Sequence, residues 1–345
     1  MVTTSSQKQL VAFLTRARSA SEVAKKLKIS LNDARVLLKS GIPNYDLVEG
    51  PRNAKNNKTF IAMPALNLGT LPKQEWALGL KDEDADKPYF EILLPEIPEA
   101  KKLRVILFDN FAFGGSDHDA KLFQRIIGEV QKPNTFCAFN GDILAPIVSR
   151  GKQEDRDRAL QNRIQAFAKI MQPVLHKVMW GQQGCMERQT QNTLGVDPIK
   201  YFCSKLNIPY YEQPVYVDMY WRDNLFTLMA AHGQSTSQTK GGRENSTERF
   251  ANQAGATDYV VRGHIGDAMS RPKEMIVRDN SVPTLKAREQ YMVVLGGCRK
   301  YWKSTAAVKG QTPTSGAILA LMLYPDGGRG IKTINERKGE DQDEQ

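Results

Sequence analysis

The sequence predicts an α/β protein that is preceded by a small basic module. Apolar runs such as LRVILFD, NTFCAFNGD and HKVMWGQQG recur from residue 103 onward, and amphipathic helical stretches separate several of them. Each run ends in polar or glycine-rich residues, as expected for buried strands of a layered domain that carry functional side chains at their C-terminal ends. The charge is uneven, since residues 1–62 hold eleven Lys and Arg against four Asp and Glu in a chain of 345 residues with net charge +10. We therefore expect two domains of different character.

The basic module, residues 1–63, is predicted to begin with three short helices. Ser19 and Glu22 form a capping box that opens the second helix, and Ser30 with Asp33 repeats the pattern at the third. Apolar residues recur on one face of each helix and are expected to be buried: Leu10, Val11 and Leu14 in the first, Val23, Ala24 and Leu27 in the second, and Leu31, Ala34, Leu37 and Leu38 in the third.

Two strands, Tyr45–Val48 and Thr59–Ala62, follow these helices and enclose the turn-rich basic loop EGPRNAKNNK. The whole pattern, above all the run SASEVAKKLKISLNDARVLLKSG, resembles a winged helix-turn-helix domain. Such domains place the third helix in the major groove of duplex DNA and the wing beside the phosphate backbone. The resemblance implies two sets of DNA contacts: Asn32, Arg35 and Lys39 from the third helix, and Arg52, Lys55 and Lys58 from the wing. Two alternatives stay open, namely a winged helix that binds protein and a basic surface that serves solubility alone.

The remaining segments and the composition argue against a membrane protein, a secreted protein and a disulfide-rich protein. Residues 64–100 are interpreted as a linker that ends in a leading strand, Tyr89–Leu94, packed on a domain of residues 101–330, and residues 331–345 as a disordered tail. No apolar run approaches the ~18 residues of a membrane span, and the N-terminus lacks the apolar core of a signal peptide. The four cysteines are scattered without a CxxC pair, which argues against a structural zinc site or a disulfide framework. These observations predict a cytoplasmic protein without a membrane partner.

Residues that could bind a metal or take part in catalysis follow the predicted strands of the second domain. In chain order they are Asp109, Gly141-Asp142, Gln182-Gln183, His232-Gly233 and Gly263-His264. This ordered set is similar to the series D-x-H, G-D-x-x-D/N, G-N-H-E/D, H and G-H-x-H of the calcineurin-like metallophosphoesterase superfamily. The segment HGQSTSQTKGGRENSTERFANQAGATDYVVRGHIGD resembles the phage and bacterial branch of that superfamily. The resemblance implies a layered β-sandwich flanked by helices, and a bacterial cell or a phage-infected host as the setting.

Members of this superfamily hold two metal ions that clamp a phosphate and activate a water molecule. For the first metal the resemblance implies Asp109, the shared Asp142 and two histidines. Phe111 and Gly266 occupy the positions of those histidines, so the first site is expected to be empty. The second metal would take four donors, with glutamine in place of the usual asparagine: Asp142, Gln182, His232 and His264. We therefore expect at most one divalent ion, Mn²⁺, Zn²⁺ or Fe²⁺, and no organic cofactor.

Gln183 occupies the position of the family's catalytic histidine, so no residue is a secure general acid. An amide can hydrogen-bond a phosphate but cannot protonate a leaving oxygen, a step typically worth about 10²–10⁴ in rate. The surrounding sequence, GQQGCME, leaves the role of Glu187 open, and Cys185 lacks a histidine in this motif that would activate it as a nucleophile. The basic stretch Gly233–Asn245 is interpreted either as a loop that holds a nucleic-acid backbone or as a plain surface loop.

These motifs lead to the hypothesis of a DNA-associated pseudo-enzyme or scaffold with a degenerate phosphoesterase site, in phage or bacterial DNA metabolism. Its expected partners are duplex DNA and proteins of replication or repair. One rival hypothesis is an active one-metal phosphodiesterase or nuclease that uses the donors of the second site. Another is a regulator whose second domain serves oligomerisation.

Overall fold

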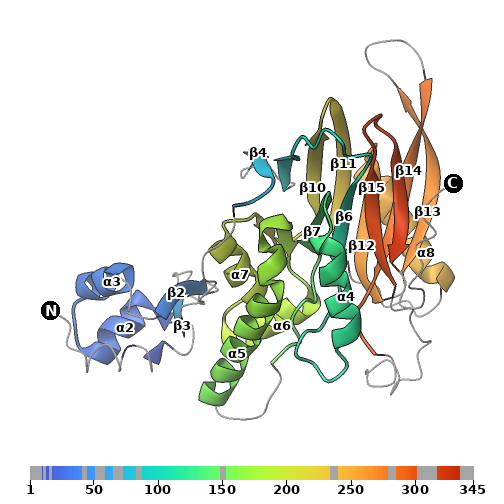
Figure 1. The fold of residues 1–345 in the computed structure, drawn as a ribbon. Coiled ribbons are helices and arrows are strands. Elements are labelled where there is room, and N and C mark those ends of the chain that lie inside the picture. The colour runs from blue at the N-terminus through green and yellow to red at the C-terminus, as the bar shows by residue number, and fades with distance from the viewer. Residues whose placement is uncertain are drawn as a thin grey trace.

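The computed structural model, shown in Figure 1, contains a small N-terminal unit followed by a larger α/β domain. The residues that it describes are 10, 13–14, 18–40, 45–50, 59–64, 73–82, 88–147, 153–233, 240–266, 268–278, 285–300 and 317–334. Among the helices of these residues, none has the length and apolar character that crossing a membrane requires.

Two helices and a three-stranded sheet make up the N-terminal unit. Their bounds are Ala20–Leu27 for α2, Leu31–Ser40 for α3, Arg18–Ser19 for β1, Tyr45–Gly50 for β2 and Thr59–Pro64 for β3, with β3 in the middle of the sheet. Both predicted capping devices are confirmed, because Ser19 Oγ accepts the N–H of Glu22 and Ser30 Oγ accepts the N–H of Asp33. The first predicted helix lies mostly outside the described residues.

The apolar faces of these helices form a small core of their own. Leu10, Val23 and Ala34 are fully buried in it. Leu31 was expected there but is 42% exposed, since it stands at the first position of α3, ahead of the residues that pack on α2. Asp46 of β2 joins this unit to the larger domain through two contacts, a hydrogen bond of 2.6 Å from the Tyr201 hydroxyl and an ion pair of 2.7 Å with Lys205.

One sheet of the larger domain has six strands. In spatial order they are β16 (Arg329–Ile334), β15 (Ile318–Leu323), β6 (Leu103–Phe108), β7 (Thr135–Phe139), β8 (Val178–Gln182) and β9 (Tyr210–Tyr211). The four strands β6 to β9 run parallel to one another, while β15 and β16 are antiparallel to their neighbours. Residues 331–334, predicted as the start of a disordered tail, are part of β16 because they pair with β15. The C-terminal ends of β6, β7 and β8 therefore meet at one edge, where functional side chains of parallel sheets gather.

The other sheet has seven strands. In spatial order they are β13 (Met269–Arg278), β14 (Leu285–Gly296), β12 (Tyr259–Gly266), β11 (Asn224–Ala231), β10 (Val215–Trp221), β5 (Tyr89–Leu93) and β4 (Ala77–Asp82). The predicted leading strand is β5, which pairs in parallel with β10, whereas β4 was not expected from the sequence. Because β11 and β12 are parallel, their C-terminal ends also lie side by side.

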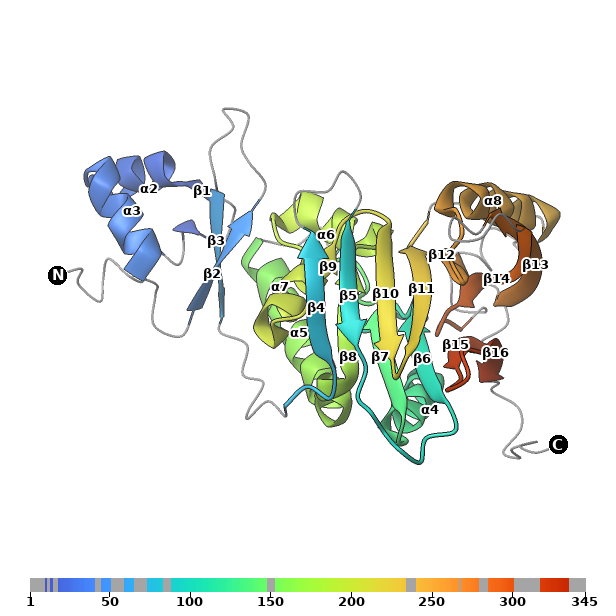
Figure 2. The same ribbon diagram turned by 90° about the horizontal axis from the view of Figure 1, so that it is seen from above.

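The two sheets pack face to face, and helices cover their outer faces (Figure 2). Phe90 of β5 lies edge-on to Trp180 of β8 with ring centroids 5.9 Å apart, and the Tyr259 hydroxyl of β12 donates to the carbonyl of Met322 in β15. The six-stranded sheet carries α4 (Ala120–Gln131), α5 (Gln153–Met171), the 3₁₀ helix η1 (Gln172–Lys177), α6 (Cys185–Leu194) and α7 (Pro198–Leu206). The seven-stranded sheet carries α8 (Lys240–Ala254), so the second half of the predicted basic loop is in fact helical.

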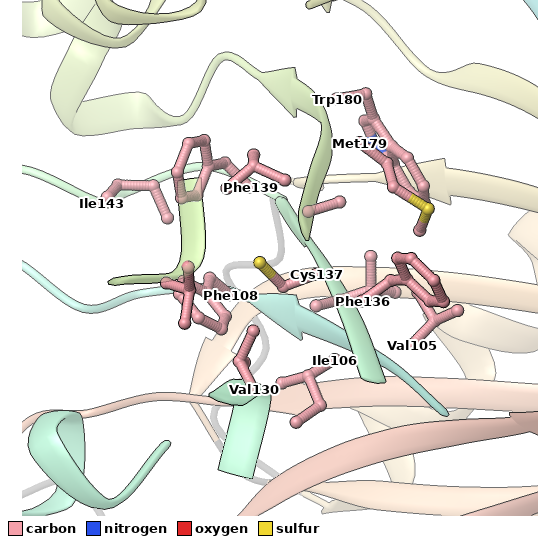
Figure 3. Close-up of a cluster of buried hydrophobic side chains, with 14 of the residues drawn as sticks. Val105, Ile106, Phe108, Val130, Phe136, Cys137, Phe139, Ile143, Met179 and Trp180 are labelled. Carbon is pink, nitrogen blue, oxygen red and sulfur yellow. The ribbon is translucent and has the colours of Figure 1, made fainter. Parts of the chain in front are cut away.

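Side chains of β6, β7 and β8 form the centre of the core between these layers (Figure 3). Ile106 lies beside Val130 of α4, whereas Val105 and Phe136 lie on the other face of the sheet. Trp180 is fully buried with them. Because these strands are buried on both faces, their sequences are continuous apolar runs. The same packing fixes the positions of the strand ends.

Candidate metal centre

Three of the predicted ligands meet where the C-terminal edges of the two sheets come together. Asp142 follows β7 in one sheet, while His232 follows β11 and His264 lies in β12 of the other. Asp142 Oδ2 is 3.3 Å from His232 Nε2 and 3.4 Å from His264 Nδ1, and the two imidazole nitrogens are 3.1 Å apart. The sheet packing thus brings residues far apart in the chain into one cluster.

The spacing of these atoms fits a metal ion. Two nitrogen or oxygen ligands at about 2.0–2.1 Å from a tetrahedral ion lie about 3.3–3.4 Å from each other, close to the three separations observed. A further donor is Cys185 at the start of α6, whose Sγ lies within 4.8 Å of a ring nitrogen of each of these histidines. Cys185, His232 and His264 therefore form a triad that can hold a metal ion, with Asp142 beside it.

Asp109 is placed differently from the expectation that it would be a metal ligand. Its Oδ1 accepts from the Asn140 amide at 3.2 Å and lies 3.0 Å from His232 Nδ1, and its Oδ2 accepts the N–H of His264 at 2.9 Å. Both oxygens are thus occupied, and the side chain is fully buried. A carboxylate on the far nitrogen of a ligating histidine fixes the ring and its tautomer, so Asp109 orients the ligands from behind.

The side chains of Gln182 and Gln183 differ in their hydrogen bonds and therefore in their roles. The Gln182 amide nitrogen donates to the carbonyls of Gln213 and Ala230, which leaves its buried oxygen without a hydrogen-bond partner and available to a ligand. The Gln183 amide donates to Gln191 and Asp197 at 2.8 Å each and accepts from Arg188 Nε at 3.0 Å. Every polar atom of the Gln183 side chain is therefore engaged in a structural network.

The two positions at which the resemblance would require histidines hold no donor. Phe111 is completely buried, with its ring centroid 4.9 Å from that of Phe108 and 5.2 Å from that of Phe123. Its side chain belongs to the aromatic core. Gly266 ends β12 opposite Gly296 of β14 and offers no side chain. Asp267, the acid that follows it, lies outside the described residues.

Close approach of backbone to side chain shapes the centre and explains its glycines. A Cβ on Gly263 would lie 1.8 Å from Asp109 Oδ1, and one on Gly184 would lie 2.0 Å from the backbone nitrogen of Asp142. Asp142 and His264 themselves adopt left-handed backbone conformations, with φ of 53° and 65°. Such conformations cost about 1–3 kcal/mol and persist where the surrounding structure holds them, which is typical of functional sites.

Glu187 holds the loop that carries Asp142, a role that the sequence left open. Its buried carboxyl oxygens accept four backbone N–H groups, those of Asp142 and Ile143 at 2.8 Å, Gly184 at 3.0 Å and Leu144 at 3.1 Å. Asp142 Oδ1 in turn accepts the N–H of Met186 at 2.7 Å, which joins the loop to the first turn of α6. These contacts fix the Asp142 carboxylate before any ligand arrives.

The titratable groups of the cluster shift one another's pKa values. Burial opposes protonation of His232, but Asp109 raises its pKa well above the usual value, and hydrogen bonds with Asp142 and Cys185 raise the pKa of His264 to about 9. The same two imidazoles lower the pKa of Cys185 to about 7. Since metal ligands must be deprotonated, an incoming ion would displace protons from this cluster.

The predicted DNA contacts divide into described and undescribed residues. Asn32, Arg35 and Lys39 are all exposed on α3, as groove-reading side chains must be. The predicted phosphate contacts of the wing lie outside the described residues: Arg52, Lys55 and Lys58.

Comparisons with known proteins add little to this description. No family model matches the chain, and no curated protein matches it. Among solved structures it is similar to GAP50, the anchor in the inner membrane complex of Plasmodium, with 11% identity and a TM-score of 0.32 over 70% of this chain and 87% of the other. It is also similar to the protein of unknown function AQ665 from Aquifex aeolicus, with 11% identity and a TM-score of 0.23 over 47% of this chain and 79% of the other. Similarity at this level assigns neither a family nor a function.

Proposed function

We propose that this chain is a DNA-associated protein with a calcineurin-like metallophosphoesterase fold and a degenerate active site that holds one divalent metal ion. The proposal rests on one observation, which is that the expected ligands of one metal ion lie together whereas two of those expected for the other ion are absent. Asp142, His232 and His264 converge with the spacing of metal ligands, whereas Phe111 has joined the aromatic core. One metal site is thus favoured and the other is not.

The metal would be held by Cys185, His232 and His264, with Asp142 as a further donor. A thiolate together with imidazoles favours Zn²⁺ over Mn²⁺. A divalent ion at this place would polarise a phosphoryl oxygen. The chain's own contribution is positional, because Asp109 fixes the His232 ring and Glu187 fixes the Asp142 loop.

The lack of a second metal site and of a general acid favours a scaffold over an enzyme. A single ion cannot clamp both the attacking and the leaving oxygen as two ions do, and Gln183 is neither acidic nor free to reach a leaving group. A role beside replication or repair proteins in phage or bacterial DNA metabolism fits such a protein, with duplex DNA bound by the N-terminal unit.

Hydrolysis of bis-p-nitrophenyl phosphate and of DNA is therefore expected to stay near background with Mn²⁺ or Zn²⁺. The assay compares the unmodified chain with His264→Ala and Asp142→Ala, which should show the same background rate. Robust turnover that both substitutions abolish would establish the second candidate, a one-metal phosphodiesterase or nuclease. The arrangement of Cys185, His232 and His264 favours this second candidate, because one bound metal ion could activate a water molecule.

DNA binding by the full chain is expected to depend on α3. Replacing Arg35 and Lys39 together by alanine should weaken binding to duplex DNA about tenfold or more and reduce its salt dependence, because each lost cation leaves counterions on the DNA. The matched control replaces Arg158 and Lys169, two exposed cations of α5, and should leave the affinity unchanged. Fluorescence anisotropy over a series of salt concentrations measures both. Equal losses in the two double variants would contradict DNA binding through α3.

A further inference from the structure

A cavity of about 250 Å³ opens beside the metal centre, between the start of α6 and the ends of β11 and β12. Cys185 and His232 line it on the side of the metal centre, and Arg188 and Arg262 line it elsewhere. Its wall therefore contains two arginine side chains. Carboxylates of the chain already accept N–H groups at the start of α6, since Glu187 accepts that of Gly184 and Asp142 accepts that of Met186, so the two arginines are the cationic groups that an anion would meet.

Arg262 has a buried guanidinium that lacks a carboxylate partner among the described residues. The side chain is 8% exposed, and its Nη1 donates to the carbonyl and the hydroxyl of Ser246. Its Nε is buried without a hydrogen-bond partner, and the guanidinium lies 5.4 Å from the ring centroid of Phe250. By contrast, Arg288 is paired with Asp258 at 2.5 Å. A buried charge that lacks an opposite charge is costly, so Arg262 is suited to an anion supplied from outside.

The acids near the cavity do not supply that anion, because each has a cation of its own. Glu212 pairs with Lys200 at 2.7 Å, and Asp142 lies against both imidazoles of the metal centre. Arg188 donates through Nε to the neutral amide of Gln183. The described part of the cavity wall therefore carries an excess of positive charge.

We propose that this cavity binds a phosphate group, free or carried by a nucleotide, through Arg262 and Arg188. Guanidinium groups bind the oxygens of phosphate with paired, charge-assisted hydrogen bonds. The inference deepens the proposed function and rests on it for the identity of the anion, because a phosphate here would lie next to the metal centre. The site does not need the metal in order to bind.

The test is isothermal titration of the full chain, freed of metal with a chelator, with inorganic phosphate, dAMP and a thymidine dinucleotide. We expect saturable binding of at least one of these, weakened about tenfold or more by Arg262→Gln and by Arg188→Gln. Arg188 is exposed, so its replacement keeps the fold even where that of Arg262 does not. Lys121→Gln, at an exposed position of α4, is the control for loss of one positive charge and should bind as the unmodified chain does.

The three probes separate the sources of the phosphate. Tighter binding of dAMP or the dinucleotide than of inorganic phosphate assigns the ligand to a nucleotide, and equal binding assigns it to the free anion. No saturable binding of any probe, or binding that Arg188→Gln and Arg262→Gln leave intact, would overturn the inference. Metal uptake measured on the same samples reports on the proposed function independently, since neither arginine belongs to the metal triad.

Discussion

Replacing Gly263 by alanine is expected to abolish metal binding and to lower the free energy of unfolding by about 3 kcal/mol or more. The new Cβ would lie 1.8 Å from Oδ1 and 2.3 Å from Cγ of Asp109. Asp109 cannot yield, because it is fully buried and holds the Asn140 amide, the His232 ring and the backbone of His264. Any shift that relieves the clash therefore moves both imidazoles. Chemical denaturation and metal uptake measure the two effects.

Gly128→Ala is the matched control for that substitution. Gly128 lies on the exposed face of α4, and a Cβ there meets no atom within 4 Å. Alanine in a helix interior is about 0.8–1.0 kcal/mol more favourable than glycine, so this variant should be slightly more stable and bind metal normally. If Gly263→Ala behaved like Gly128→Ala, the close packing of β12 on Asp109 would be refuted.

Phe111→His is expected to destabilise the protein by about 3 kcal/mol or more and to add no second metal. The substitution introduces the histidine that the resemblance to metallophosphoesterases would require, but the position lies inside the aromatic core against Phe108 and Phe123. A histidine there loses aromatic packing and buries polar nitrogens without a partner. Thermal unfolding and metal analysis of the same preparation check both parts of the prediction.

The control for this variant is Phe111→Leu, which keeps the position apolar and should lose only about 1.5 kcal/mol. Its metal content should equal that of the unmodified chain. A Phe111→His variant that is as stable as the unmodified chain and takes up a second equivalent of metal would show that position 111 still faces the site.

The sequence was informative wherever a local signal decides the structure. The capping boxes at Ser19 and Ser30 depend only on residues three apart, and both formed as predicted. The positions of Asp142, His232 and His264 after apolar runs likewise placed them at strand ends. Parallel neighbours in each sheet then bring these ends together, which is a general property of such sheets.

Features that depend on packing between distant elements could not be read from the sequence. Cys185 has no histidine in its own motif, and it meets His232 and His264 only because the seven-stranded sheet packs against the six-stranded one. Gln183 stands where the motif predicted it, but its side chain donates to Asp197, the residue that caps α7. The helix α8 has a loop-like composition, yet Phe250 and Ala251 pack it onto the seven-stranded sheet, and tertiary packing overrides local preference.

We propose that the chain binds one metal ion and that Cys185 is among its ligands. Titration of the chelator-treated full chain with Co²⁺ tests both statements, because the absorption of a thiolate–cobalt charge-transfer band reports on the bound metal. We predict saturation at one equivalent, with a band that Cys185→Ser removes and that Cys137→Ala, a change at a buried cysteine of the core, leaves in place. Saturation at two equivalents, or a band that persists in Cys185→Ser, would show that the chain does not bind a single ion through Cys185.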